Sequence, residues 1–279
     1  MALVAIDFTA PDAPQRFVES LRETGFGVLR NHPISQELVD TIYREWLDFF
    51  SSDEKEAYRF HRDTQDGFFG RDVAETAKNF EKQDIKEYFH YYPWGQCPPA
   101  LKPSLERYYA EAHKVAATLL SWVEEYSPDE VSRHYSQPLS KMIERSEQTL
   151  LRILHYPPLS GDEEEGAVRA AAHEDINLLT ILPAGSATGL QVLGKDGDWI
   201  DVPCDFENLI INIGDMLQEA SGGYFPSTKH RVINPDGAAR DVSRMSLPLF
   251  LHPRPDVVLS ERHTAKSYLQ ERLRELGVV

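Results

Sequence analysis

Apolar residues in the first half of the chain recur every three or four positions, which is the period of an amphipathic helix. Three stretches show this pattern: residues 12–25, 35–50 and 103–125. A short apolar run at Val4–Phe8 predicts a strand, and Gly25–Leu29 predicts a turn that leads into another strand. A polar and aromatic insert at about 61–100 separates the second helical stretch from the third.

From Thr149 onward the pattern changes to short apolar runs separated by Pro, Gly and Asp. The predicted strands are 150–156, 178–182, 190–193, 199–202, 209–213, 230–233 and 245–251. Strands that follow one another without intervening helices favour a double-sheet barrel or sandwich over βαβ units. A final helix is expected at about 262–275. We therefore expect a single unit, 1–279, with a helix-rich region 1–145, a β-rich core 146–256 and a C-terminal helical segment 257–279.

Composition narrows the partners and the compartment. A hydrophobic fraction of 41% over 279 residues is sufficient for a large core, and the net charge of −16 argues against nucleic acid or an anionic membrane surface as a partner. The two cysteines, Cys97 and Cys204, match neither a zinc site nor a disulfide framework, which favours the reducing cytoplasm. No basic leader or long apolar span is visible. The oligomeric state is left open.

The stretch His173-Glu174-Asp175 comes just before an apolar run that predicts a buried strand. Alternate side chains of a strand share a face, so His173 and Asp175 should point together and Glu174 toward solvent. Taken alone, such a pair is more often a surface or hydrogen-bonded pair than a metal site. His230 begins another predicted strand. Two imidazoles and one carboxylate would form a facial triad that leaves metal positions open and suits non-haem Fe(II).

Arg244 and Ser246 also share one face of a predicted strand. An arginine that points into an apolar barrel needs an anionic partner, because its guanidinium cannot be deprotonated. A carboxylate bound through two hydrogen bonds is the best match, with the Ser246 hydroxyl as a further donor. The alternative for Arg244 is a structural salt bridge within the protein.

With these motifs and several others, the sequence resembles the Fe(II)/2-oxoglutarate-dependent oxygenases, in their isopenicillin N synthase-like branch. The resemblance covers nearly the whole chain. The similar stretches are 25–28, 84–89, LRILHYPP at 151–158, HEDINLLTIL at 173–182, TGLQV at 188–192, WIDVP at 199–203, NIGDMLQEASGG at 212–223, STKHRV at 227–232 and RMS at 244–246. The resemblance implies a mainly β fold with α: a double-stranded β-helix (jelly-roll) core in 146–256, flanked by N-terminal helices and a C-terminal helix.

The resemblance also assigns roles. The family motif H-x-D…H falls on His173, Asp175 and His230, which become the catalytic iron ligands. The motif R-x-S falls on Arg244 and Ser246, which in relatives bind the distal carboxylate of 2-oxoglutarate.

A further donor to that carboxylate is expected from Tyr156. Leu154 stands where many plant members carry Asn, so the resemblance implies one hydrogen bond fewer to the co-substrate. Gly222 also replaces a frequent Asn.

The implied activity is the oxidation of a small molecule, by hydroxylation, desaturation or cyclisation, with release of succinate and CO2. O2 is the oxidant and ascorbate a candidate reductant. Phe69 and Phe89 are candidate substrate contacts, with core packing as the alternative, and Arg71, Lys78 and Lys82 could receive an anionic substrate. Two rival functions are an iron-dependent oxidase of the same superfamily that does not use 2-oxoglutarate, and a metal-holding or ligand-binding barrel without turnover.

Overall fold

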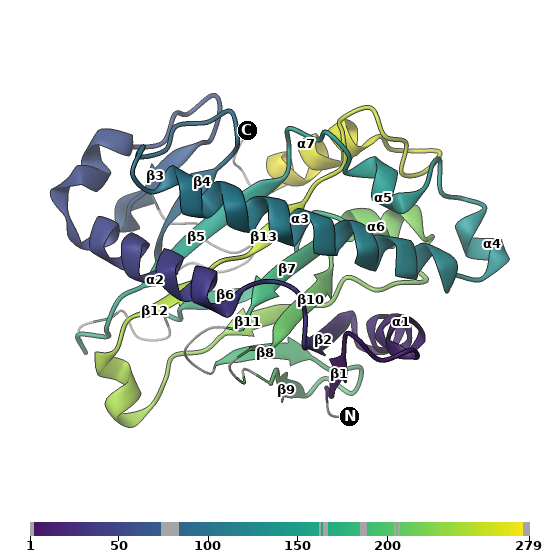
Figure 1. Cartoon of the computed structure of the whole chain (residues 1–279), viewed down its shortest axis with the longest axis horizontal. Coiled ribbons are helices and arrows are strands. Elements are labelled where there is room, and N and C mark those ends of the chain that lie inside the picture. The colour runs from purple at the N-terminus through teal and green to yellow at the C-terminus, as the bar shows by residue number, and fades with distance from the viewer. Residues whose placement is uncertain are drawn as a thin grey trace.

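The computed structural model describes residues 3–73, 84–161, 163, 167–184, 189–203, 205 and 207–275. Two β-sheets face each other in it, and helices cover the outer side of the larger sheet (Figure 1). The larger sheet contains β1 (Ala5–Asp7), β2 (Phe26–Arg30), β10 (Leu209–Ile213), β7 (Leu179–Pro183), β13 (Leu249–Leu251), β5 (Leu150–Tyr156), β4 (Glu87–Tyr91) and β3 (Gly67–Phe69), in this order, with β12 (Arg244–Ser246) also paired to β5. The smaller sheet has the order β6 (Ala170–His173), β11 (His230–Val232), β8 (Leu190–Leu193) and β9 (Trp199–Asp201).

The helices lie mainly in the first half of the chain. Their bounds are α1 Ala13–Thr24, α2 Gln36–Ser51, α3 Lys102–Glu125, α4 Asp129–Ser132, α5 Leu139–Met142, α6 Asp215–Ala220 and α7 Ala265–Glu275, with 3-10 turns η1 Asp53–Tyr58, η2 Arg71–Val73 and η3 Gly237–Asp241. Helix α1 ends at Gly25, whose φ of 76° lets its amide bond the Leu21 carbonyl before β2 begins. Helices α2 and α3 pack on the larger sheet. None of the described helices is long and apolar enough to cross a membrane.

The register of the larger sheet separates two faces. Tyr88, Leu154 and Ser246 lie opposite one another on β4, β5 and β12, and Arg244 lies opposite Tyr156. Residues that face each other across antiparallel strands lie on the same side of a sheet, so these five share the side turned away from the helices.

The other side of the larger sheet packs against the helices. Phe89 lies opposite Ile153, and its ring is 4.8 Å from that of Trp46 on α2. One cluster of buried apolar residues takes in parts of α1, α2, α3, the larger sheet and α7. Because this cluster is continuous, we propose that the chain is one unit with the regions 1–145, 146–256 and 257–279.

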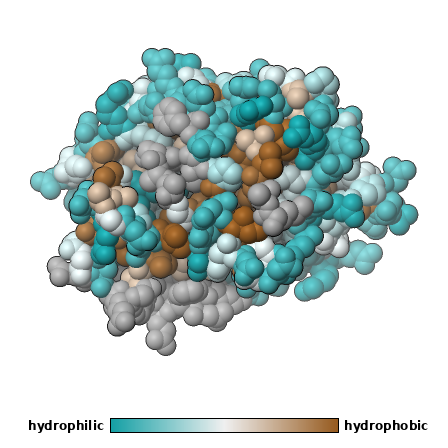
Figure 2. Space-filling model, turned by 90° about the horizontal axis from the view of Figure 1, so that it is seen from below, coloured by the Kyte–Doolittle hydropathy of each residue, from teal (hydrophilic) through white to brown (hydrophobic). Residues whose placement is uncertain are grey.

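On the face below the smaller sheet, apolar side chains gather in a band that is bordered by hydrophilic ones (Figure 2). Apolar groups therefore reach the surface on this side of the molecule.

The predicted fold class is confirmed, and β5, β8 and β10 have the predicted bounds. The strand expected at 245–251 is wrong in detail: it is two strands, β12 and β13, separated at Leu247 and Pro248. Proline has no amide to donate to a ladder, so pairing is interrupted there. Strand β6 was not predicted, because a run of alanines carries little β-propensity. Strands β3 and β4 fall in the insert, where no strand was expected.

Candidate metal centre and anion site

The structure brings His173, Asp175 and His230 together. His173 ends β6, His230 begins β11, and the two residues are partners in the antiparallel ladder, with ring centroids 4.4 Å apart. One ligand atom from each of the three residues lies within 4.8 Å of the others. Asp175 follows β6 rather than belonging to a strand, so the alternation argument that paired it with His173 is wrong. Glu174 is exposed, as expected.

Both imidazole rings are oriented by backbone carbonyls. Nδ1 of His173 donates to the Ala171 carbonyl at 2.7 Å, and Nδ1 of His230 donates to the Thr228 carbonyl at 3.2 Å. A carbonyl can only accept, which assigns the proton to Nδ1 and leaves the Nε2 lone pair available. The two Nε2 atoms lie 3.9 and 3.7 Å from Oδ1 of Asp175.

Hydrogen bonds to the second carboxylate oxygen of Asp175 fix the orientation of its side chain. Its Oδ2 accepts hydrogen bonds from Oγ1 of Thr180 and from Nδ2 of Asn212, the latter at 2.8 Å. Burial opposes ionisation, but the two histidines and these hydrogen bonds together hold the pKa of Asp175 below its ordinary value. The group is therefore a carboxylate with one oxygen committed to the protein and Oδ1 turned toward the histidines.

The charge state of His173 suits a metal ligand. Burial, followed by repulsion from His230, lowers the pKa of His173 to about 4, although 41% of this side chain stays accessible. The ring is neutral at physiological pH and can bind a cation. Two imidazole nitrogens and one carboxylate oxygen, with the His173 side accessible, fit a divalent iron ion that keeps exchangeable positions.

Arg244 lies deeper, and its side chain has no protein anion as a partner among the described residues. The residue is 3% exposed, its guanidinium carbon is 5.4 Å from the centre of the Tyr156 ring, and Ser246 is two residues further along the same face. Its Nε and Nη1 are buried without a hydrogen-bond partner in the described ranges. The structural salt bridge considered for Arg244 is not found in that part of the chain. A buried cation with unsatisfied donors fits an anionic ligand.

Phe69 and Phe89 have different surroundings. Phe69 stacks on Tyr88 at 4.8 Å and belongs to a small cluster with Leu154 and Tyr156, on the same side as the anion site. Phe89 points to the helix side and packs on Trp46, so its position corresponds to core packing. Tyr88, the neighbour of Phe89 on β4, lies instead on the same side of the sheet as the anion site.

One of the three cationic candidates lies among the described residues. Arg71 is exposed. Lys78, Lys82 and Cys204 lie outside the described residues.

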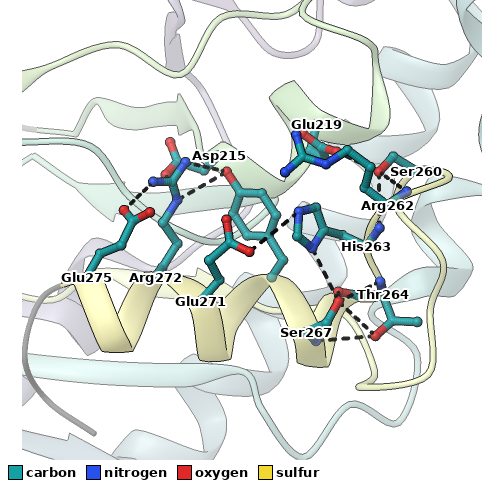
Figure 3. Close-up of polar contacts among 11 residues, drawn as sticks. Asp215, Glu219, Ser260, Arg262, His263, Thr264, Ser267, Glu271, Arg272 and Glu275 are labelled. Carbon is teal, nitrogen blue, oxygen red and sulfur yellow. Dashed lines mark hydrogen bonds and ion pairs between the residues drawn. The ribbon is translucent and has the colours of Figure 1, made fainter.

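Sequence reasoning missed the groups that hold the metal-binding segment. The Asp215 amide donates to the Asp175 carbonyl at 2.7 Å, and the Met216 amide donates to the Ile176 carbonyl at 3.1 Å. Arg272 of α7 lies 3.5 Å from the Asp215 carboxylate and also bonds the Tyr268 hydroxyl (Figure 3). The start of α6 therefore fixes the segment after His173, and α7 is anchored to α6.

Other missed residues carried a readable signal. Thr180 and Asn212 are polar residues inside the apolar runs of two predicted strands, and they lie opposite each other in the ladder of β7 and β10. A polar residue in a buried strand points to a partner.

Comparisons with known proteins agree with this geometry. Residues 147–253 match the 2OG-Fe(II) oxygenase superfamily, and residues 5–113 match the family described as non-haem dioxygenase in morphine synthesis N-terminal. The chain is 30% identical to 2-oxoglutarate-dependent dioxygenase 11 of Oryza sativa subsp. japonica, over 93% of this chain and 74% of that protein.

Solved structures give the same picture. The chain is similar, at 62% identity and a TM-score of 0.92 over the full length of both chains, to a Shewanella oneidensis protein assigned to the oxygenases. The fold is also similar to that of a full-length Neurospora crassa protein in complex with alpha-KG, at 21% identity and a TM-score of 0.79, over 98% of this chain and 96% of that one.

Proposed function

Because the chain belongs to the 2OG-Fe(II) oxygenase superfamily, we propose that His173, Asp175 and His230 are the ligands of its catalytic iron. The protein is a non-haem Fe(II)- and 2-oxoglutarate-dependent dioxygenase. It oxidises a small molecule with O2 and converts 2-oxoglutarate to succinate and CO2. The observation that carries the ligand assignment is the approach of the three ligand atoms to within 4.8 Å of one another.

The protein residues perform the preparatory work at this site. Iron, when bound, supplies O2 activation and the oxidation of substrate. The carbonyls of Ala171 and Thr228 hold the two imidazoles with Nε2 toward the metal position, and Thr180 keeps the Asp175 carboxylate turned the same way. Such outer hydrogen bonds set the orientation and the basicity of metal ligands.

Arg244, Ser246 and Tyr156 are proposed to bind the distal carboxylate of 2-oxoglutarate. Support comes from the buried donors of Arg244 and from the register that places all three on the side of the sheet away from the helices. Leu154 lies on the same face and has no polar group to add. The Arg244 guanidinium is therefore the principal charged partner of this end of the co-substrate.

The substrate wall is proposed to include Phe69, which lies with Tyr88 beside the co-substrate residues. Hydroxylation, desaturation and cyclisation all fit this site, and ascorbate is the proposed reductant that maintains Fe(II). The net charge of −16 and the two cysteines support the proposals of a cytoplasmic location and of no nucleic-acid or membrane partner.

The test is a screen of small molecules with Fe(II)-loaded protein under air, scored by succinate release above the level without substrate. We expect at least one compound to stimulate succinate formation that needs both iron and 2-oxoglutarate. Iron-dependent oxidation of a compound in the complete absence of 2-oxoglutarate would instead identify the oxidase-type reaction.

A further inference from the structure

A second arginine, Arg169, is buried next to the anion site and lies outside the R-x-S motif. It comes directly before β6 and is 1% exposed. One Nη donates to the Val242 carbonyl at 3.1 Å, whereas its Nε is buried without a hydrogen-bond partner among the described residues. The Arg169 side chain is therefore held in place, but one of its hydrogen-bond donors has no partner among the described residues.

The guanidinium groups of Arg169 and Arg244 both lie near the ring of Tyr156. Their guanidinium carbons lie 6.0 and 5.4 Å from the centre of the Tyr156 ring. Within the described ranges, neither guanidinium has a carboxylate within 4.0 Å. The two positive charges repel each other, and after burial itself this repulsion is the next cause that lowers the pKa of Arg169. Two buried like charges are tolerated together only when an anion is placed between them or beside them.

We propose that Arg169 is a second cationic partner of the distal carboxylate of 2-oxoglutarate, acting together with Arg244 on that group. The proposal rests on the proposed function and adds a specificity residue to it. A carboxylate has two oxygens with about four acceptor positions, so two hydrogen bonds from Arg244 leave acceptor positions for a second guanidinium. Because Leu154 on the same face offers no donor, Arg169 supplies an interaction that this strand does not.

A purely structural role for Arg169 makes different predictions. Its bond to the Val242 carbonyl and its position near Tyr156 would then stabilise the protein whether or not 2-oxoglutarate is present. A role in co-substrate binding predicts the reverse pattern: without 2-oxoglutarate the charge is uncompensated, so its removal leaves the melting temperature unchanged or raises it.

The experiment uses the full chain loaded with Fe(II) under anaerobic conditions, with Arg169→Gln, Arg169→Lys and the control Arg254→Gln. Arg254 also donates to backbone carbonyls, those of Lys141 and Glu144, and belongs to neither proposed site. Dissociation constants are measured for 2-oxoglutarate and for 2-oxobutyrate, which lacks the distal carboxylate. Melting temperatures are measured without either acid.

We expect Arg169→Gln to weaken 2-oxoglutarate about 10- to 150-fold, the range for a lost hydrogen bond to a charged group, and to leave 2-oxobutyrate within about twofold of the wild type. Arg169→Lys should recover part of the loss, because the charge remains, and Arg254→Gln should bind both acids normally.

Equal 2-oxoglutarate affinity in wild type and Arg169→Gln, or an equal loss for both acids together with a lower melting temperature, would overturn the role of Arg169. An iron-loaded wild type that does not bind 2-oxoglutarate at all would overturn the proposed function itself.

Discussion

Replacing Thr180 by valine tests how the protein holds its metal ligand. Oγ1 of Thr180 donates to Oδ2 of Asp175 and accepts a hydrogen bond from Nδ2 of Asn177 at 2.9 Å, and both neighbours are buried. Valine keeps the shape and removes both bonds. Loss of the bond to the ionised carboxylate should cost about 1.5–3 kcal/mol, and the orphaned amide of Asn177 should add about 1–3 kcal/mol.

The loss of free energy of metal binding should be similar in size to the loss of the hydrogen bond to Asp175. Loss of an outer hydrogen bond to a metal ligand typically lowers metal affinity about 10- to 100-fold, which corresponds to about 1.4–2.8 kcal/mol. The assay is an anaerobic Fe(II) titration of wild type and Thr180→Val, with thermal unfolding of the metal-free proteins beside it. Thr149→Val is the matched control, since Thr149 is also fully buried but donates to the carbonyl of His252. Thr180→Val with wild-type Fe(II) affinity would refute the reasoning, whatever its stability.

Four further substitutions test the account, three of them at the proposed site. His230→Ala should abolish iron-dependent succinate formation while far-ultraviolet circular dichroism stays native; retained iron content and turnover would show that the ligand is misassigned. Arg244→Lys should raise the dissociation constant for 2-oxoglutarate about 10- to 150-fold and leave iron affinity unchanged, because lysine cannot form two parallel hydrogen bonds to a carboxylate. Tyr156→Phe should raise the same constant about tenfold or more. A variant whose 2-oxoglutarate titration curve coincides with that of the wild type would remove its residue from the site. Burial lowers the pKa of His252 to about 4, below the ordinary 6.5 expected on unfolding, so its contribution destabilises the fold as pH falls from about 6.5 to 4, by about 3 kcal/mol in total. As pH is lowered from about 6.5 to 4, the free energy of unfolding should therefore fall less steeply in His252→Gln than in the wild type. Parallel curves for the two proteins would contradict this.

The sequence predicted the elements whose signal is local. Strand β5 and helix α3 were found within a residue of their bounds, because one is a continuous apolar run and the other a long amphipathic repeat. The sequence also singled out the three residues that the structure brings together as proposed metal ligands, since a histidine and an aspartate beside a core need a compensating partner. The position of Asp175 after the end of β6 was not predicted. It is set by a backbone hydrogen bond with Asp215, some forty residues later in the chain.

Other features depended on contacts that no local pattern contains. The choice between Tyr88 and Phe89 as the inward residue depends on the register of β4 against β5, and the insert gave no alternation from which to read it. Arg169 has no motif of its own. Its importance arises only when the fold places its guanidinium beside the ring that Arg244 also approaches.

The most direct test of the central claim is an anaerobic titration of 2-oxoglutarate into Fe(II)-loaded protein, followed by visible absorption. The wild type should develop a weak charge-transfer band that saturates at one 2-oxoglutarate per chain, because the co-substrate binds the iron held by His173, Asp175 and His230. Asp175→Ala should give no band at the same iron and protein concentrations. No band in iron-loaded wild type, or an undiminished band in Asp175→Ala, would contradict the account.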